Sequence, residues 1–195
     1  METLEQWDRA LFLFLNGLNH EFLDMPMYIM TKAWCWIPVF VFLIFQVYRR
    51  YPVRKHLILV LLGVIVCVGA NDLISYRGFK LNVKRYRPTH NLEIGHQVHT
   101  VNDFNGNEYR GGKYGFLSSH AANYFGIATY CFLALGSSKK YWWLFLWAGL
   151  IVYTRIYLGV HYPSDILCGG LLGVLVGWIT FKLLQPYISK QTSPS

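Results

Sequence analysis

The sequence predicts an all-α integral membrane protein, a helical bundle of about five transmembrane helices with an N-terminal helix at the membrane interface. Hydrophobic residues make up 54% of the 195 residues and charged residues only 14%, whereas soluble domains carry about 25% charged residues. Five apolar runs are each close to the ~20 residues that a helix needs to cross the hydrocarbon core. This composition excludes a soluble enzyme of ordinary surface and an intrinsically disordered chain.

The predicted spans cover most of the chain. They are residues 27–48, 57–76, 116–136, 141–159 and 166–184. Ahead of them, residues 4–18 are amphipathic, with Trp7, Leu11 and Leu15 at helical spacing, which predicts an interfacial helix within residues 1–20. A long loop is predicted at residues 77–115 and a tail at residues 190–195. We expect residues 1–195 to form a single membrane domain.

Charge placement predicts how the bundle is oriented. Alternate connections between the spans are purely basic, and the positive-inside rule places them in the cytoplasm. Their basic residues are Arg49, Arg50, Arg54, Lys55, Lys139, Lys140, Lys182 and Lys190. All 10 acidic residues fall on the other side or near that end of a span. The N-terminus and the loop at residues 77–115 are therefore expected to face outward.

The outward side also carries cations, against this topological preference. They include Arg77, Lys80, Lys84, Arg85, Arg87, Arg110, Lys113 and Arg155. Their position indicates anion binding, and a basic loop attracted to anionic lipid headgroups is the alternative. Arg110 and Lys113 are candidates for contacting a headgroup or a second phosphate. No nucleic-acid partner is expected, because the cations divide between the two membrane faces.

The first of three short motifs follows the second span and runs from Lys80 to Pro88. Lys80 and Arg87 are seven residues apart, or about two helical turns, so we expect them to share one face of a helix that ends at Pro88. Two cations on one face form a clamp for a phosphate. An ordinary basic juxtamembrane helix has the same pattern.

The second motif is Leu117-Ser118-Ser119-His120, at the start of the third span. Ser118 is a natural N-cap, and the free N–H groups of a helix start favour an anion. His120 is then expected in the first helical turn, beside that anion. The alternative is a capped helix with an unrelated interfacial histidine.

The third motif joins the last two spans and contains Arg155, His161 and Asp165. Pro163 suits the first position of the final helix, and Asp165 in its first turn complements the helix dipole. A carboxylate four residues from His161 can hold the imidazole in one tautomer and raise its basicity, which a nucleophilic or basic histidine requires. The alternative is a capping aspartate beside an unrelated histidine.

Taken together, K-x6-RP, S-x-H and R-x5-H-x3-D resemble the three-part pattern of the type 2 phosphatidic acid phosphatase superfamily, which includes bacterial membrane lipid phosphatases and the vanadium haloperoxidases. The resemblance covers residues 80–165. Two departures stand out: Leu117 and Ser119 replace the usual Pro and Gly of the middle motif, and Thr154 replaces the usual Ser of the third. Ser119 adds a side chain where the family keeps the backbone bare, which bears on substrate fit and rate.

The resemblance implies a mechanism through a phosphohistidine. His161 attacks phosphorus, Asp165 orients it, and His120 acts first as general acid and then as base for the hydrolytic water. The phosphate-binding residues that it implies are Lys80, Arg87, Ser118, Ser119 and Arg155. It implies no metal and no other cofactor, because the cations take the part that Mg²⁺ plays in other phosphoryl-transfer sites.

The resulting hypothesis is an integral membrane lipid phosphatase at the outer leaflet of a bacterial inner membrane, with its site facing the periplasm. Its partners are then the bilayer and a lipid phosphate, and the sequence leaves the oligomeric state open. Small family members act on lipid A, undecaprenyl pyrophosphate, phosphatidylglycerophosphate or phosphatidate, and the long basic loop favours lipid A slightly. Two alternatives stay open: a lipid-to-lipid phosphotransferase, and a non-catalytic protein that binds or transports lipid phosphates.

Overall fold

The computed structural model describes residues 2–188, so the tail expected at residues 190–195 lies outside the described part. The α-helices are α1 (Glu2–Asn16), α2 (Glu21–Met30), α3 (Ile37–Arg50), α4 (Arg54–Leu73), α5 (Leu81–Val83), α6 (Ser119–Ala134), α7 (Trp143–Tyr157) and α8 (Pro163–Ile188). A π-helical segment, η2 (Ile74–Lys80), joins α4 to α5, and short 3₁₀ turns include η1 (Ala33–Trp36), η3 (Pro88–His90), η4 (Gly95–Gln97) and η5 (Lys139–Tyr141). The expected all-α class is confirmed.

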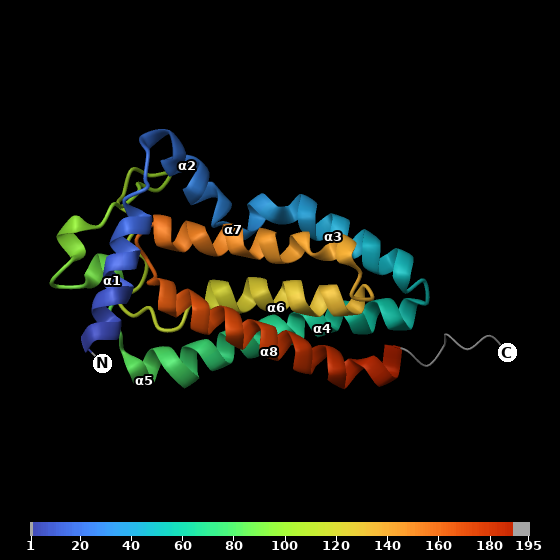
Figure 1. Ribbon diagram of the computed structural model, residues 1–195. Coiled ribbons are helices and arrows are strands. Elements are labelled where there is room, and N and C mark those ends of the chain that lie inside the picture. Colours follow the sequence, from blue (N-terminus) through green and yellow to red (C-terminus); the bar gives the residue numbers. More distant parts are fainter. Residues whose placement is uncertain (1, 189–195) are drawn as a thin grey trace.

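Five helices, α3, α4, α6, α7 and α8, run side by side along the bundle, and α1 lies across one end of it (Figure 1). Within residues 2–188, two continuous helices are long and apolar enough to cross a membrane, Arg54–Val83 with 30 residues and Pro163–Ile188 with 26, and the bent pair Glu21–Met30 and Ala33–Arg50 makes a third if it is one span. The shorter α6 and α7 have 16 and 15 residues, or about 24 Å and 22 Å at the α-helical rise. The membrane bundle is therefore as expected, whereas five full spans stay a prediction.

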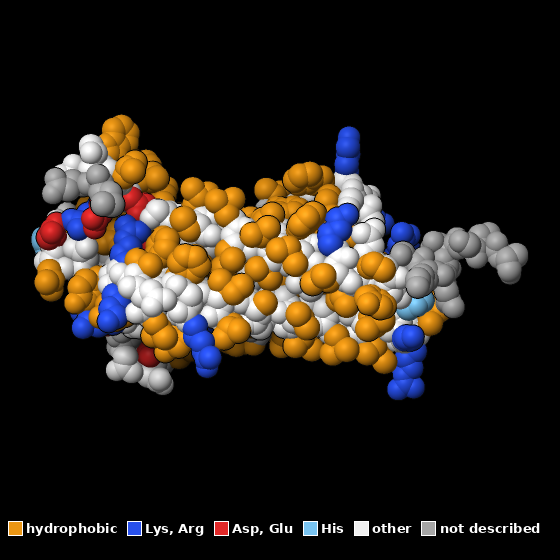
Figure 2. All heavy atoms as spheres, turned by 90° about the horizontal axis from the view of Figure 1, so that it is seen from below, with side chains coloured by type: hydrophobic (Ala, Val, Ile, Leu, Met, Phe, Trp, Pro, Cys, Tyr) orange, Lys and Arg blue, Asp and Glu red, His pale blue; other side chains and the backbone are white. Residues whose placement is uncertain are grey.

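The face of the bundle that Figure 2 shows carries apolar side chains along its length. Exposed side chains include Leu146 of α7, Leu171 and Leu183 of α8, and Ile65 of α4. On the face shown, charged side chains gather toward the two ends, and acidic ones are seen only at the end that holds α1. An apolar belt between two polar ends is the surface that a lipid bilayer stabilises.

The first predicted span, residues 27–48, is wrong as a single helix. The chain bends by 77° between Glu21–Met30 and Ala33–Arg50. Lys32 takes an extended backbone conformation at the bend, and Pro38 lies in the first turn of α3, where a missing N–H costs nothing. The indole N–H of Trp36 donates to the Met30 carbonyl across the bend at 2.7 Å. The apolar run does not show this break, because the bend is made by polar contacts within a hydrophobic stretch.

The N-terminal helix predicted at residues 4–18 is present as α1, but its faces differ from expectation. Trp7 and Leu11 are exposed, whereas Leu15, expected on the same face, is partly buried against the cluster around the fully buried Phe12. Asn16 at the end of α1 donates to the carbonyls of Ile156 and Tyr157 at 3.1 Å and 2.9 Å. These bonds cap the end of α7 and fasten α1 to the bundle; the interfacial position of α1 stays a prediction.

The closest helix packing joins α6 to α8 along a row of glycines in α8. A Cβ added at Gly169 would lie 2.4 Å from the Ser118 carbonyl oxygen, and one at Gly173 would lie 2.2 Å from the Ala122 carbonyl oxygen. Residues four apart share a helix face, and small residues there let two backbones approach. This contact holds the start of α6 beside the start of α8, which is where the second and third sequence motifs lie.

We expect Gly173→Ala to lower the free energy of unfolding by about 1–3 kcal/mol, because the added methyl group forces α6 and α8 apart. The measurement is thermal unfolding in detergent. Gly149→Ala in α7 is the matched control, since nothing lies within 4 Å of a Cβ there, and it should leave stability unchanged or raise it through better helix propensity. An equal loss in both variants would contradict the packing argument.

Candidate functional site

The structure brings all eight predicted site residues to one end of the bundle, the end where α1 lies (Figure 1). Lys80 ends η2, and Ser118, Ser119 and His120 lie at the start of α6. Arg155 lies in the last turn of α7. The remaining residues are Arg87 in the loop after α5, His161 between α7 and α8, and Asp165 in the first turn of α8.

The expected helix carrying both Lys80 and Arg87 on one face is wrong. The helix ends at Val83, and Lys84 takes the left-handed conformation with φ 50° and ψ 32°. Arg87 is extended, with φ −66° and ψ 157°, as the residue before a proline prefers. Its N–H donates to the Lys113 carbonyl at 3.1 Å. Of the two cations expected to clamp a phosphate, Lys80 therefore lies on a helical segment, whereas Arg87 lies on a loop that pairs with the segment before α6.

Gly115 in that segment brings the first and third motifs together. A Cβ added there would lie 3.1 Å from Asp165 Oδ2, 3.2 Å from Arg87 Cγ and 3.5 Å from His161 Nδ1. The bare backbone at Gly115 thus leaves room for three functional side chains around one point. The second motif joins them through a backbone bond, since the Ser118 N–H donates to the Asp165 carbonyl at 3.1 Å.

His161 and Asp165 form the pair that the sequence predicted. His161 is 1% exposed, and its Nδ1 lies 3.4 Å from Asp165 Oδ2. That separation is longer than an ordinary hydrogen bond, and catalytic bonds of this kind often tighten only when substrate is bound. Asp165 Oδ2 also accepts the Tyr162 N–H at 3.0 Å, so the carboxylate is held on the side that faces the imidazole.

Burial, followed by the positive charges of Arg87, Arg155 and Lys80, holds the pKa of His161 well below its usual value of 6.5. The imidazole is therefore neutral at pH 7. With its proton on Nδ1, toward Asp165, the ring presents the lone pair of Nε2 away from the carboxylate. A neutral, oriented imidazole is able to act as a nucleophile.

Two buried guanidinium groups stand next to this histidine. Arg87 is 9% exposed and Arg155 is 2% exposed, and within residues 2–188 neither makes a salt bridge to a carboxylate. Burial, and then the charge of Arg155, lowers the pKa of Arg87 to about 10. Two buried cations that repel one another and have no counter-charge make a site that favours an anion.

Neutral groups hold these two guanidinium groups in place. Arg87 Nε donates to the Tyr114 carbonyl at 3.2 Å. Arg155 donates to the Thr31 hydroxyl, and also to the Tyr109 hydroxyl at 3.1 Å. Thr31 and Tyr109 are functional candidates that the sequence did not reveal, because both lie far from Arg155 along the chain and in no motif. The bend after α2 is what brings Thr31 to the site.

Ser118 and Ser119 have separate tasks. The Ser118 hydroxyl accepts the Ala121 N–H at 3.4 Å as the N-cap of α6, as predicted. The Ser119 hydroxyl accepts from Lys80 Nζ at 2.9 Å and lies 2.8 Å from the Ser75 hydroxyl. The side chain that stands at the family's glycine position thus orients Lys80.

Arg110 and Lys113, the candidates for a second phosphate, do not join this cluster of cations through any direct contact. Arg110 is paired with Glu108 at 2.7 Å. The Lys113 ammonium lies 5.4 Å from the centre of the Tyr86 ring. A headgroup contact by either residue stays a prediction.

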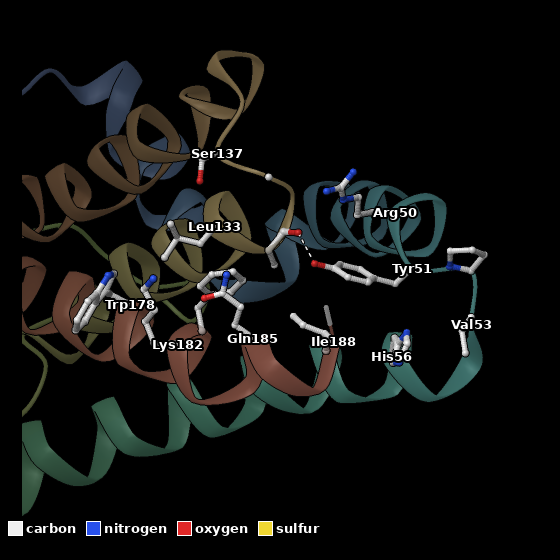
Figure 3. A pocket seen from close by; sticks show the side chains of 14 residues that line it. Arg50, Tyr51, Val53, His56, Leu133, Ser137, Trp178, Lys182, Gln185 and Ile188 are labelled. Carbon is white, nitrogen blue, oxygen red and sulfur yellow. Dashed lines mark hydrogen bonds between the residues drawn. The ribbon is translucent and has the colours of Figure 1, made fainter. Parts of the chain in front are cut away.

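A cavity of about 660 Å³ lies at the other end of the bundle. Figure 3 shows Arg50 from the end of α3, His56 from α4 and Lys182 from α8 around it. None of the eight candidate residues lines this cavity. The size of this cavity alone does not make it the functional site. Among the described residues, buried charged side chains and a histidine oriented by a carboxylate are found at the α1 end.

The family described as the PAP2 superfamily matches residues 57–188. The chain belongs to the PAP2 superfamily. The matched region contains all three motifs, which places the candidate residues within the part of the chain that is shared with the family.

Two relatives within the PAP2 superfamily are named lipid A 4'-phosphatase. The protein from Porphyromonas gingivalis is 34% identical over 94% of this chain and 75% of its own length. The protein from Bacteroides thetaiotaomicron is 31% identical over 99% of this chain and 84% of its own length. The fold is also that of the transmembrane PAP2 type phosphatidylglycerolphosphate phosphatase from Bacillus subtilis, with a TM-score of 0.64, 23% identity, and coverage of 99% of this chain and 90% of that one.

We expect Tyr109→Phe to weaken binding of inorganic phosphate about fivefold, because Arg155 loses one hydrogen bond worth about 1 kcal/mol. Isothermal titration calorimetry of the purified protein in detergent measures this. Tyr153→Phe is the matched control, since its hydroxyl donates to the Leu15 carbonyl and not to an arginine. Equal phosphate affinity in the two variants would show that Tyr109 does not support Arg155.

Proposed function

We propose that this PAP2 protein is a membrane lipid phosphatase that removes phosphate from an envelope lipid, with lipid A as the favoured substrate. The observation that carries the proposal is a buried, neutral His161 beside Asp165 and two buried arginines without carboxylate partners. Such a site stabilises a phosphoryl group and places a nucleophile beside it. The names of the relatives from P. gingivalis and B. thetaiotaomicron support lipid A over other lipids.

In the first step, Nε2 of His161 forms a bond to phosphorus while the bond from phosphorus to the leaving oxygen breaks. His120 donates a proton to that oxygen as general acid. Asp165 accepts the hydrogen bond from Nδ1–H of His161 and stabilises the positive charge on the ring. The geometry favours Nε2 as the attacking nitrogen, because Asp165 faces Nδ1 and so leaves Nε2 for the substrate.

In the second step, water attacks phosphorus and the bond from phosphorus to Nε2 breaks. His120, now unprotonated, accepts the proton from that water. Throughout, the phosphoryl oxygens are held by the cations and by the start of α6. These groups are Lys80, Arg87, Ser118, Arg155 and the backbone amides near Ser119.

We infer that the reaction needs no metal ion, because three cations already surround the phosphoryl group. In the part of the chain from residue 2 to residue 188, no three His, Cys, Asp or Glu side chains lie close enough together to hold one. We also place the site on the outer face of a bacterial inner membrane, following the basic connections at the other end. Residues 1–195 then act as one membrane domain.

The test is release of inorganic phosphate in mixed micelles over a panel of lipid A, undecaprenyl pyrophosphate, phosphatidylglycerophosphate and phosphatidate, with and without EDTA. We expect fastest release from lipid A, unchanged by EDTA. His161→Ala should lower the rate by about 10³-fold or more and His120→Ala by about 10²–10⁴-fold. His96→Ala is the matched control, because this exposed loop histidine lies outside the site.

Three results would contradict parts of this proposal. Full activity in both histidine variants would exclude the mechanism. Loss of activity in EDTA, restored by a divalent cation, would exclude metal independence. Transfer of phosphate to a second lipid without release would identify a phosphotransferase, and no turnover of any lipid would leave a binding protein.

The ionisation of His161 can be measured directly. Because burial and neighbouring cations lower its pKa, we expect its ¹⁵N resonances to remain those of a neutral imidazole at pH 6, below the ordinary value of 6.5. The measurement uses ¹⁵N-histidine-labelled protein in micelles, with His161→Asn to assign the signals. A resonance that is mostly protonated at pH 6 would contradict the proposed electrostatics.

A further inference from the structure

The helix α1 reaches the site through one carboxylate. Asp8 Oδ1 accepts the backbone N–H of Ser164 at 2.9 Å, and Asp8 Oδ2 accepts the Ser164 hydroxyl. Ser164 is the second residue of α8 and directly precedes Asp165. Asp8 and Ser164 lie 156 residues apart in the chain. An acidic side chain from α1 therefore binds a free N–H at the start of α8, where a carboxylate is stabilised by the helix dipole.

Arg85 connects the same carboxylate of Asp8 to Asp165. Its Nη2 donates to Asp8 Oδ2 at 2.7 Å, and its Nη1 donates to Asp165 Oδ1 at 2.9 Å and to the Ser164 hydroxyl at 2.7 Å. The three side chains are shielded from water, with Arg85 20%, Asp8 12% and Asp165 0% exposed. A planar guanidinium between two carboxylates fixes their relative positions in a way that a lysine cannot.

The two oxygens of Asp165 consequently have different partners. Oδ1 is held by Arg85, and Oδ2 accepts the Tyr162 N–H and faces His161 Nδ1 at 3.4 Å. Because that last distance exceeds an ordinary hydrogen bond, a shift of a few tenths of an ångström decides whether the bond forms. The groups that hold Oδ1 therefore control how Asp165 meets the imidazole.

A second contact ties α1 to the same place. The guanidinium of Arg85 lies 4.1 Å from the centre of the Tyr162 ring. The buried Phe12 of α1 packs against the same ring, at 5.4 Å between ring centres. Tyr162 directly follows His161 in the chain. Helix α1 thus contacts two residues that lie between His161 and Asp165 in the chain, Tyr162 through Phe12 and Ser164 through Asp8.

We propose that Asp8 and Arg85 are positioning residues for the nucleophile, through which α1 sets the place of the Asp165 carboxylate against His161. This inference rests on the proposed phosphatase function. Neither residue touches the substrate in this scheme, and each acts through Asp165. Arg85 was visible in the sequence only as one of many outward cations, and Asp8 carried no signal of a role at a site 156 residues away.

The test compares Asp8→Asn, Arg85→Gln and Arg85→Lys with wild type in the phosphate-release assay. Asp8→Asn and Arg85→Gln should each lower kcat by about 10–100-fold, the usual effect of losing a group that orients a functional ligand, with KM within about twofold. Arg85→Lys keeps the positive charge but not the paired N–H donors of the guanidinium, so its kcat should lie between those of Arg85→Gln and wild type. The double variant should be no slower than Arg85→Gln alone, because the two residues act in series.

Arg9→Gln is the matched control for α1. Arg9 neighbours Asp8, and its ion pairs go to Glu5 and Glu93 instead of to the site. Arg9→Gln should lose both ion pairs and keep wild-type kcat. Thermal unfolding of each variant in detergent identifies any that has lost its fold, and the kcat comparison is made among variants that melt cooperatively.

The pH profile separates positioning from a merely structural role. The charged and titratable groups around His161 are Lys80 from η2, Arg85 and Arg87 from the loop, His120 from α6, Arg155 from α7 and Asp165 from α8. Since the charge of Arg85 helps to lower the pKa of His161, Arg85→Gln should move the acid limb of kcat/KM to higher pH. The ionisation of the substrate is the same for both proteins, so the difference reports the enzyme.

The outcomes are distinct. If wild type releases no phosphate, the proposed function fails. If wild type is active and His161→Ala is inactive, but Asp8→Asn and Arg85→Gln match Arg9→Gln in kcat, the function stands and the positioning role is overturned. A fall in kcat without any movement of the acid limb in Arg85→Gln would also overturn it, because that pattern reports a general loss of structure.

Discussion

The functional end of this molecule is organised around positive charge that is buried without a protein counter-ion. Arg87 and Arg155 are almost entirely removed from water, and their partners are the carbonyl of Tyr114 and the hydroxyls of Thr31 and Tyr109. Burying a charge without a counter-charge is unfavourable. A phosphate group supplies the missing negative charge, so the feature that destabilises the free protein is the one that gives it affinity for an anion.

Rigid helix packing keeps these charges from separating. Glycines of α8 bring its backbone against α6, and this contact fixes the two helix starts that carry Ser118 and Asp165. The last turn of α7 carries Arg155 at the same end of the bundle. Loops supply Arg87 and His161, and these two loops are tied to each other, since the Thr89 N–H donates to the Gly159 carbonyl at 3.2 Å. A site built from the ends of packed helices holds its geometry better than one on free loops.

Among residues 2–188, the acidic side chains near the site pair with Arg85 and do not neutralise Arg87 or Arg155. Asp8 and Asp165 bind Arg85 and backbone N–H groups at the start of α8. These bonds engage both carboxylates with Arg85 and leave Arg87 and Arg155 without an acidic partner within residues 2–188. The same end of the bundle thus contains Arg85, which is neutralised, and separate cations that are open to a phosphate, Arg87 and Arg155. This division follows from the positions of the two carboxylates.

The sequence by itself determined the class of molecule and predicted most of the candidate residues, because both depend on local patterns. Apolar runs predict a membrane bundle, and Arg155, His161 and Asp165 are candidates because three short motifs together resemble those of one family. Tertiary structure decided what depends on contacts between distant segments: the bend that takes Thr31 to Arg155, the loop that replaces the expected Lys80–Arg87 helix, and the link from Asp8 to Ser164. Periodicity reports only which face of an element is apolar. A hydrogen bond between side chains 124 or 156 residues apart forms only once packing has brought them together.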